Sequence, residues 1–349
     1  THYSVLPNRR KVMKKLLLYA FLLPTLIQPQ QKKLRLLYDL AQDYGDFFQQ
    51  DEHDNGFWKK FKKALHKKGY SAQAAKYSLQ SLQDSYDADC VIFFNLPMSL
   101  THGKLRPLRN AKTAAFLFEP PATSPHQYQQ RRWDIVDNIF TWNDELIDNK
   151  KVHKFHWMQY NLNPTNPFMH DQRPFNKKKL CTMISSNRHS NHPQALFNKR
   201  LEIIDFFDNL NTYELDLFGR SCAGNRQKSY KGSVDNKYKC MSNYRFYICF
   251  ENMDGPAGYI TEKIFDCFFG GCVPIYLGAP NIDKYIPQNC FINMRNFNSY
   301  QELYSFIKNI SAKKHEQYLT NIKNFLAGPQ ARPFSQEAMI ETYLSCLKE

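Results

Sequence analysis

The segment YRFYICFENMDGPAGYITEKIFDCFFGGCVPIYLG, residues 244–278, decides how the rest of the chain is interpreted. Its apolar and aromatic run over Phe246–Phe250 predicts a strand that is buried on both faces. Two glycines and a proline predict a loop over Met253–Gly258. Thr261 is a good N-cap for a helix, whose apolar 3–4 spacing continues until two glycines end it. The run VPIYL, Val273–Leu277, predicts the next strand.

A strand, a loop, a helix and a second strand form a βαβ unit, which is typical of parallel α/β sheets. Ligands of such sheets bind beyond the carboxyl ends of the strands. At that edge the sequence places Asn252, Tyr259, Glu262 and Lys263. The helix N-terminus and Lys263 attract an anion, and the other three suit the base, ribose or hydroxyls of a nucleotide sugar. The alternative is that Glu262 and Lys263 are an ordinary solvated pair, because exposed ion pairs are common.

Residues 250–297 resemble the donor-binding segment of the α-1,3/1,4-fucosyltransferases, glycosyltransferase family 10. The matching elements are FEN, YITEK, an apolar helix, GCVPIYLG and FINMRNF, in that order. The resemblance implies an α/β fold of GT-B type, in which two Rossmann-like domains face a cleft. It also implies an inverting glycosyltransferase that uses GDP-fucose, with Asn252, Tyr259, Glu262 and Lys263 binding the donor.

A second matching segment is FLFEPPATSPH, Phe116–His126, which is similar to a family segment of the form F-x-E-x-P-x-x-S-P. It follows the third strand predicted from the sequence, Lys112–Phe118. The resemblance implies that Glu119 is the general base that takes the proton of the acceptor hydroxyl. A carboxylate at the end of a strand, stiffened by two prolines, is well placed for that work. The alternative is that Glu119 only caps a turn.

The donor phosphates are expected beyond the first strand of a second domain, Leu180–Ser186. The resemblance implies that Ser186 and Asn187, the S-N pair after this strand, contact the donor, and that an arginine holds the pyrophosphate. Arg200 is the candidate, because a guanidinium can hold two phosphate oxygens at once. Arg188 lies nearer the S-N pair and is a rival.

No spacing of residues argues for a metal site, and no metal ligands are predicted. The positive groups Lys263 and Arg200, together with the helix N-terminus, can stabilise the departing GDP directly. We therefore expect no required cofactor, with a divalent ion at most stimulatory. Lys237 and Lys239, in a polar loop expected over residues 221–239, are weaker candidates for phosphate contacts, because such loops are more often only solvated.

The length of 349 residues suggests about two domains. We expect a basic and apolar N-terminal segment over residues 1–31, an acceptor-binding domain with the catalytic base over 32–160, a linker over 161–179, and a donor-binding domain over 180–330. Residues 331–349 are expected to form a C-terminal helix that packs back toward the first domain.

Charge and cysteine content bear on partners and compartment. The net charge of +15 permits nucleic acid, anionic membranes or phosphorylated substrates as partners, but no nucleic-acid-binding motif supports the first. The stretch RRKVMKKLLLYAFLLPTLI, residues 9–27, fits a signal or weak anchor, an interfacial helix or a buried helix, so peripheral membrane contact is expected as one interpretation. Nine cysteines without a C-x-x-C favour reduced thiols. A cytoplasmic or inner-membrane location would follow in a bacterium, and a Golgi membrane in a eukaryote.

The sequence thus favours an inverting fucosyltransferase that moves L-fucose from GDP-fucose to a hydroxyl of a glycan containing N-acetylglucosamine or galactose. An α-1,3 linkage is expected, with 1,4 or another linkage left open, and so is a role in protein glycosylation, lipopolysaccharide or other glycan biosynthesis. Two alternatives remain open: a GT-B enzyme with another nucleotide sugar, and a catalytically silent relative that binds a glycan or a nucleotide. The residues do not name the acceptor.

Overall fold

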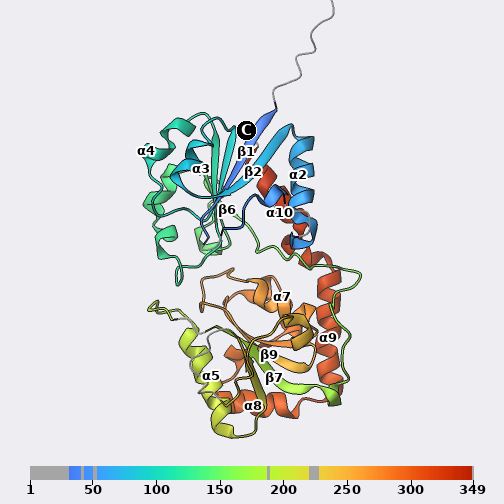
Figure 1. The fold of residues 1–349 in the computed structure, drawn as a ribbon. Helices are drawn as coiled ribbons and strands as arrows, with labels where there is room; N and C mark the ends of the chain where they lie inside the picture. The colour runs from blue at the N-terminus through green and yellow to red at the C-terminus, as the bar shows by residue number, and fades with distance from the viewer. Residues whose placement is uncertain (1–30, 41–42, 50–52, 187–188, 220–227, 348–349) are drawn as a thin grey trace, which may run out of the picture.

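The computed structural model describes residues 31–40, 43–49, 53–186, 189–219 and 228–347. The chain forms two α/β domains, one above the other in Figure 1, each built around its own parallel sheet. Each sheet lies between layers of helices and loops, so its strands are buried and read as continuous apolar runs. This explains why strands such as Cys90–Phe94 contain no alternation of polar and apolar residues.

The N-terminal domain has six parallel strands in the order β2-β1-β3-β4-β5-β6. Helix α2, Phe57–Lys67, covers one face with its aromatic side chains and turns its lysines to solvent. Two shorter helices, α3 (Leu79–Gln83) and α4 (His102–Leu105), complete this domain. The strands are β1 (Lys32–Tyr38), β2 (Tyr70–Lys76), β3 (Cys90–Phe94), β4 (Lys112–Leu117), β5 (Asn138–Thr141) and β6 (Val152–Lys154).

The C-terminal domain has five parallel strands in the order β11-β10-β9-β7-β8. The chain begins this sheet at β7, adds β8 on one side, and then crosses to β9 on the other side. The strands are β7 (Lys179–Ile184), β8 (Leu215–Phe218), β9 (Tyr244–Phe250), β10 (Val273–Leu277) and β11 (Ile292–Asn293). The helices are α5 (Phe197–Leu210), α6 (Lys237–Met241), α7 (Glu262–Phe269), α8 (Tyr300–Asn309) and α9 (Ala312–Ala327).

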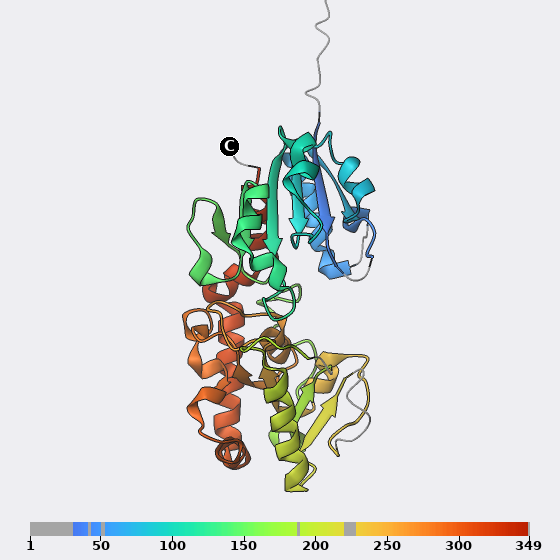
Figure 2. The ribbon, with the colours of Figure 1, turned by 90° about the vertical axis from the view of Figure 1, so that its left-hand side faces the viewer.

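The last helix, α10 (Gln336–Ser345), leaves the C-terminal domain and packs into the N-terminal one, as Figures 1 and 2 show in red. Its Tyr343 is fully buried, with ring centroids 5.0 Å from Phe61 and 4.6 Å from Phe116. Aromatic pairs at such distances add to the free energy of burial. Helix α10 is therefore part of the core of the first domain.

The local predictions from the central segment are confirmed: β9, the Thr261 N-cap, α7 and β10 lie where the sequence places them. One prediction was wrong in its count. The strand before Glu119 is the fourth, not the third, because β2 (YSAQAAK) is rich in alanine and lacks the β-branched residues that mark a strand. Helix α9 was not predicted, and the polar loop expected to reach residue 239 ends where α6 begins at Lys237.

The expected linker, residues 161–179, runs along the C-terminal domain, with Phe168 and Phe175 against its core. The N-terminal segment predicted from residues 1–31 lies, but for its last residue, outside the described residues. Within the described residues, no helix is long and apolar enough to cross a membrane. The eight described cysteines carry free thiols, and seven of them are buried, so they fill core space as small apolar groups.

Candidate active site

A polar cavity of about 320 Å³ lies at the carboxyl ends of β7 and β9 and faces the N-terminal domain. The sheet order reverses between these two strands, and parallel sheets bind ligands at such a point. We call it the donor cavity. Its polar lining residues are Glu119, Ser185, Ser186, Arg200, Lys237, Asn252, Thr261, Glu262, Lys263 and Asp266.

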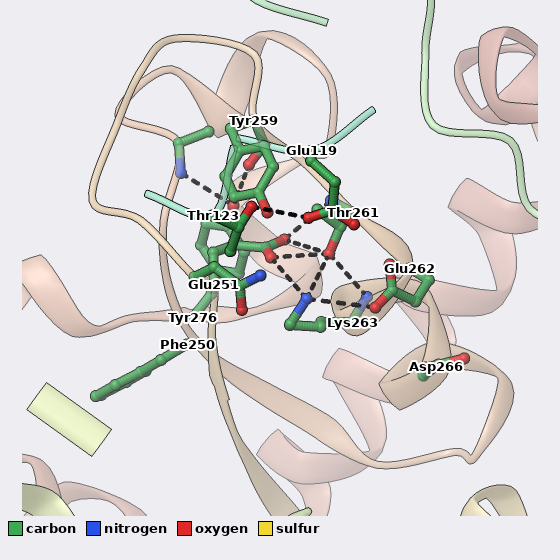
Figure 3. Close-up of polar contacts among 12 residues, drawn as sticks. Glu119, Thr123, Phe250, Glu251, Tyr259, Thr261, Glu262, Lys263, Asp266 and Tyr276 are labelled. Atoms are coloured by element: carbon green, nitrogen blue, oxygen red, sulfur yellow. Dashed lines mark hydrogen bonds and ion pairs between the residues drawn. The ribbon is translucent and has the colours of Figure 1, made fainter. Parts of the chain in front are cut away.

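A three-residue network anchors the floor of the donor cavity, as Figure 3 shows. Glu251 has no exposed surface, and its carboxylate accepts hydrogen bonds from the backbone nitrogen (2.9 Å) and the hydroxyl (2.8 Å) of Thr261. The ammonium of Lys263 lies 3.3 Å from the same carboxylate. Gly278 makes room for this arrangement, since a Cβ there would lie 2.5 Å from Cγ of Glu251. The network fixes the first turn of α7 against the end of β9.

Lys263 is held between two carboxylates. Its ammonium is 3.3 Å from Glu262 as well as from Glu251. Burial disfavours its charged form, but the two carboxylates outweigh this effect and raise the pKa of Lys263. Burial also opposes the charge of Glu262, but Lys263 outweighs it and lowers the pKa of that carboxyl. The cavity therefore presents a permanent cation at a helix N-terminus, an arrangement that suits a phosphate.

Arg200 sits deeper, on the first turn of α5, with 7% of its surface exposed. Its guanidinium donates hydrogen bonds to the carbonyl of Phe250 (2.7 Å) and to the amide oxygen of Asn252 (3.0 Å). Burial lowers its pKa, and Glu251 opposes that shift. An arginine stays charged under these conditions. It thus orients Asn252 and adds a second positive charge beside Lys263.

Tyr259 joins the donor cavity to the other domain. Its ring is buried against Trp142, with centroids 4.5 Å apart, in the loop that follows β5. The preceding Gly258 has φ +86°, and a Cβ there would lie 2.4 Å from the Trp142 carbonyl oxygen. Nearby, Asp144 accepts hydrogen bonds from Asn281 and Tyr285, each at 2.7 Å. These contacts tie the segments after β9 and β10 to the N-terminal domain.

Asp266 forms the far wall of the donor cavity, one turn along α7 from Glu262. Its carboxylate accepts hydrogen bonds from Lys237 (2.6 Å) and Tyr238 (3.0 Å) of α6. Burial raises the pKa of Asp266 to about 6, although Lys237 works against the shift. Of the two weaker candidates for phosphate contacts, Lys237 lines the cavity, whereas Lys239 is exposed.

Glu119 reaches the donor cavity from the opposite domain, just beyond the end of β4. Its carboxylate accepts a hydrogen bond from the hydroxyl of Thr123 at 2.8 Å. Its backbone is fixed by the Asn95 side chain (3.4 Å) and by the Tyr128 hydroxyl (2.9 Å). The carboxylate is half-buried and faces open space, so one of its oxygens is available to a ligand.

A second cavity, of about 290 Å³, opens on the other side of Glu119 and is called here the aromatic cavity. Glu119 and Trp157 line both cavities. The other lining residues are Leu40, Tyr44, Phe47, Phe57, Trp58, Phe94, Phe118, Met158, Tyr160, Met339 and Tyr343. The two cavities therefore meet at a carboxylate.

The structure brings together all the described residues that the sequence proposed as a site. Glu119, Ser186, Arg200, Asn252, Tyr259, Glu262 and Lys263 all line the donor cavity. Asn187 and the rival Arg188 lie outside the described residues. The sequence analysis assigned no role to Glu251 or Asp266. Glu251 lies within the matching FEN element, which was a usable signal, whereas Asp266 is recognised only through its contact with α6.

Two facing Rossmann-like domains with a polar cavity between them form an α/β fold of GT-B type. The same architecture is found in the crystal structure of an alpha1,3-fucosyltransferase with GDP-fucose, at a TM-score of 0.53 and 17% identity, covering 91% of this chain and 90% of that one. At this identity the likeness concerns the fold.

The sequence comparisons match one family. Residues 174–325, which hold most of the C-terminal domain, match the model for "Glycosyltransferase family 10 (fucosyltransferase) C-term". The chain is 36% identical to the Alpha-(1,3)-fucosyltransferase FucT of Helicobacter pylori over 32% of this chain and 22% of the relative. It is 30% identical to the 4-galactosyl-N-acetylglucosaminide 3-alpha-L-fucosyltransferase 9 of Bos taurus over 45% of this chain and 39% of the relative. The matches thus span less than half the length of these relatives.

Proposed function

We propose that the chain is an inverting fucosyltransferase that transfers L-fucose from GDP-fucose to a hydroxyl of a glycan containing N-acetylglucosamine or galactose, in α-1,3 linkage. The observation that carries the proposal is the position of Glu119, which faces Lys263, Glu262 and Arg200 across the same cavity. A base and a cationic phosphate site on opposite walls are the two parts that an inverting transfer needs. The names of the relatives support the choice of donor and linkage.

In the proposed reaction, the acceptor hydroxyl attacks the anomeric carbon of fucose from the side of Glu119. Glu119 takes the hydroxyl proton as the new C–O bond forms. The bond between the anomeric carbon and the phosphate oxygen breaks, and GDP leaves with the electron pair. Lys263, Arg200 and the N-terminus of α7 stabilise the negative charge that develops on the phosphate.

The donor's ribose and base would lie along the polar residues of α7 and the β9 loop. Glu262 is the half-buried carboxylate at the start of α7, and a carboxylate there can accept hydrogen bonds from ribose hydroxyls. Asn252, held by Arg200, presents its amide to the same space. Tyr259 would act through its ring, which fixes the loop against Trp142.

No cofactor is proposed for the chemistry. The carboxylates of Glu251, Glu262 and Asp266 are already paired with Lys263 or Lys237, so these ammonium groups take the part that a divalent ion would play toward the donor. A divalent ion would at most stimulate the rate.

The test is GDP release by the purified protein from GDP-fucose, with acceptors that contain galactose or N-acetylglucosamine, in the presence of EDTA. Acceptor-dependent release that EDTA does not reduce is the expected result. UDP-galactose, UDP-glucose and GDP-mannose run beside it. If the nucleotide is released faster from one of these sugars than from GDP-fucose, that sugar is the donor instead. A loss of turnover with EDTA would overturn the metal-independent mechanism.

A further inference from the structure

The aromatic cavity lies where a parallel sheet is expected to bind a ligand. Leu40 follows β1, Phe94 ends β3, and Phe118 follows β4, so the cavity is built on the carboxyl ends of three strands. The order of the N-terminal sheet reverses between β1 and β3. The cavity therefore occupies the same position in its sheet as the donor cavity does in the other.

The lining of this cavity does not suit a bare sugar ring. Each hydroxyl of a sugar needs a hydrogen-bond partner when it leaves water, and an unpaired one costs free energy. Among the described lining residues, Glu119 is the only charged one, and apart from the hydroxyl and N–H groups of the tyrosines and tryptophans the lining is apolar. Phe47 and Trp58 stack against each other with centroids 4.7 Å apart, so this wall is a packed aromatic surface. Such surfaces gain most from contact with an apolar group.

We propose that the aromatic cavity binds an apolar aglycone, an alkyl or aryl group attached to the acceptor sugar. The acceptor sugar would then lie beside Glu119, where the two cavities meet, and its aglycone would extend into the N-terminal domain. This inference rests on the proposed function, since it names a class of acceptor for the same site. The continuity of the two cavities through Glu119 and Trp157 is what links the apolar group to the reacting sugar.

The test measures binding, so it does not depend on turnover. The protein is saturated with GDP and titrated with methyl, butyl, hexyl and phenyl β-galactosides and β-N-acetylglucosaminides, by calorimetry and by tryptophan fluorescence. Each fully buried methylene strengthens binding roughly fourfold. We expect Kd to fall at least tenfold from methyl to hexyl. The phenyl glycosides show whether an aryl group binds as well as an alkyl chain.

Two variants locate the binding. Tyr44→Asp places a charge at the rim of the cavity, at a side chain with 45% of its surface exposed, where folding tolerates the change. Tyr213→Asp makes the same change at an exposed tyrosine of the C-terminal domain. Tyr44→Asp should abolish the dependence on chain length, whereas Tyr213→Asp should keep it. Thermal unfolding checks that both variants are folded.

The outcomes separate the two proposals. Equal affinity for methyl and hexyl glycosides would overturn the aglycone site, even if fucose is transferred. Chain-length dependence that survives in Tyr44→Asp would place the apolar group elsewhere and would also overturn it. Dependence that is lost only in Tyr44→Asp, together with no transfer from GDP-fucose, would support the aglycone site and reject the proposed function.

Discussion

The two cavities that meet at Glu119 are built in opposite ways. The charges of the donor cavity come mostly from one stretch, residues 251–266, joined by Arg200 and Lys237. The rings of the aromatic cavity come from five separate parts of the chain, which include α2 and α10. The residues of the donor cavity are therefore mostly close together in the sequence, whereas those of the aromatic cavity come together only when the chain folds.

The difference has a physical cause. Charged groups must be paired when they are buried, and in the donor cavity the partner of Glu251 and Glu262 is Lys263, in the same short segment of the chain. Such pairing leaves a recognisable motif. Apolar contact is not directional, so any aromatic side chain that the fold brings near can line a cavity. Tyr343 illustrates this, since it reaches the cavity from the last helix of the chain.

The largest expected effect comes from the residue that the two cavities share. Glu119→Gln keeps an oxygen that can accept the Thr123 hydrogen bond but removes the base. We expect kcat to fall about 10³-fold, because a positioned general base typically contributes 10²- to 10⁴-fold. GDP-fucose affinity should stay within a factor of two. Rates are measured by GDP release, and affinities by calorimetry.

The control for Glu119→Gln is Glu145→Gln, at an exposed glutamate after β5 of the same domain. It should have wild-type activity. Full activity in Glu119→Gln would show that Glu119 is not the general base. The two cavities would then be neighbours without a common chemical role.

The second prediction breaks the local network of the donor cavity. Lys263→Met leaves Glu251 buried without its cation. We expect GDP affinity to fall roughly 10- to 100-fold, as for the loss of a hydrogen bond to a charged group, and the free energy of unfolding to fall by about 2–3 kcal/mol. Adding Glu251→Gln should restore much of the stability, because the unpaired carboxylate is gone, but not the affinity. Affinity that returns with stability would mean that Lys263 only supports the fold.

Much of the fold could be predicted because its signals are local. The end of β9, the Thr261 N-cap and the glycines after α7 each act within a few residues, and the structure places them as expected. Strand β2 was not predicted from the sequence because its alanines have weak strand preference, and its burial comes from pairing with β1. The position of α10 depends on ring contacts between residues far apart in sequence, such as Phe61 and Tyr343.

The residues of the candidate site likewise divide into those that could be predicted from a local motif and those that could not. Asn252, Tyr259, Glu262 and Lys263 could be proposed from one motif, and they line one cavity. Asp266 could not, because on the sequence it is one more polar residue in a helix. Only its hydrogen bonds to two residues of α6 reveal that it is a buried carboxylate of the cavity wall. The aromatic cavity left no pattern that the sequence could show.

The third prediction concerns this buried carboxylate and pH. The unfolded chain releases the proton of Asp266 near its ordinary pKa of 3.8, whereas the folded chain holds it until about 6. Between these two pH values the folded state binds more protons than the unfolded state. The stabilisation that comes from the proton on Asp266 is therefore complete below pH 4 and is lost as the pH rises through 6. The difference corresponds to roughly 3 kcal/mol. Asp266→Asn should remove this loss, because the amide does not ionise.

The measurement is urea unfolding of both proteins at pH 4, 5, 6 and 7. The stability of Asp266→Asn relative to the wild type should rise over this range. Asp283→Asn, at an exposed aspartate of the same domain, is the control and should follow the wild type. A parallel pH dependence in wild type and Asp266→Asn would show that Lys237 compensates fully for burial, and the far wall of the donor cavity would then be as well paired as its floor.

The smallest effect is expected for Arg200→Lys, which asks whether Arg200 serves the fold or the donor. The guanidinium clamps the end of β9 through the Phe250 carbonyl and Asn252, and a lysine can keep only part of this. We expect the free energy of unfolding to fall by about 1–2 kcal/mol and GDP affinity to fall several-fold. Arg332→Lys, at an exposed arginine, should change neither.

The relative size of the losses in stability and in GDP affinity of Arg200→Lys shows whether Arg200 serves the fold or the donor. A clamp that only holds β9 would lose stability and keep its affinity for GDP once folded, as measured at a temperature well below unfolding. In that case the pyrophosphate arginine would have to be sought elsewhere, with Arg188 as the next candidate. A loss of affinity at unchanged stability would instead place the free N–H groups of Arg200 on the phosphates, and the donor cavity would then hold GDP with cations from two helices, α5 and α7.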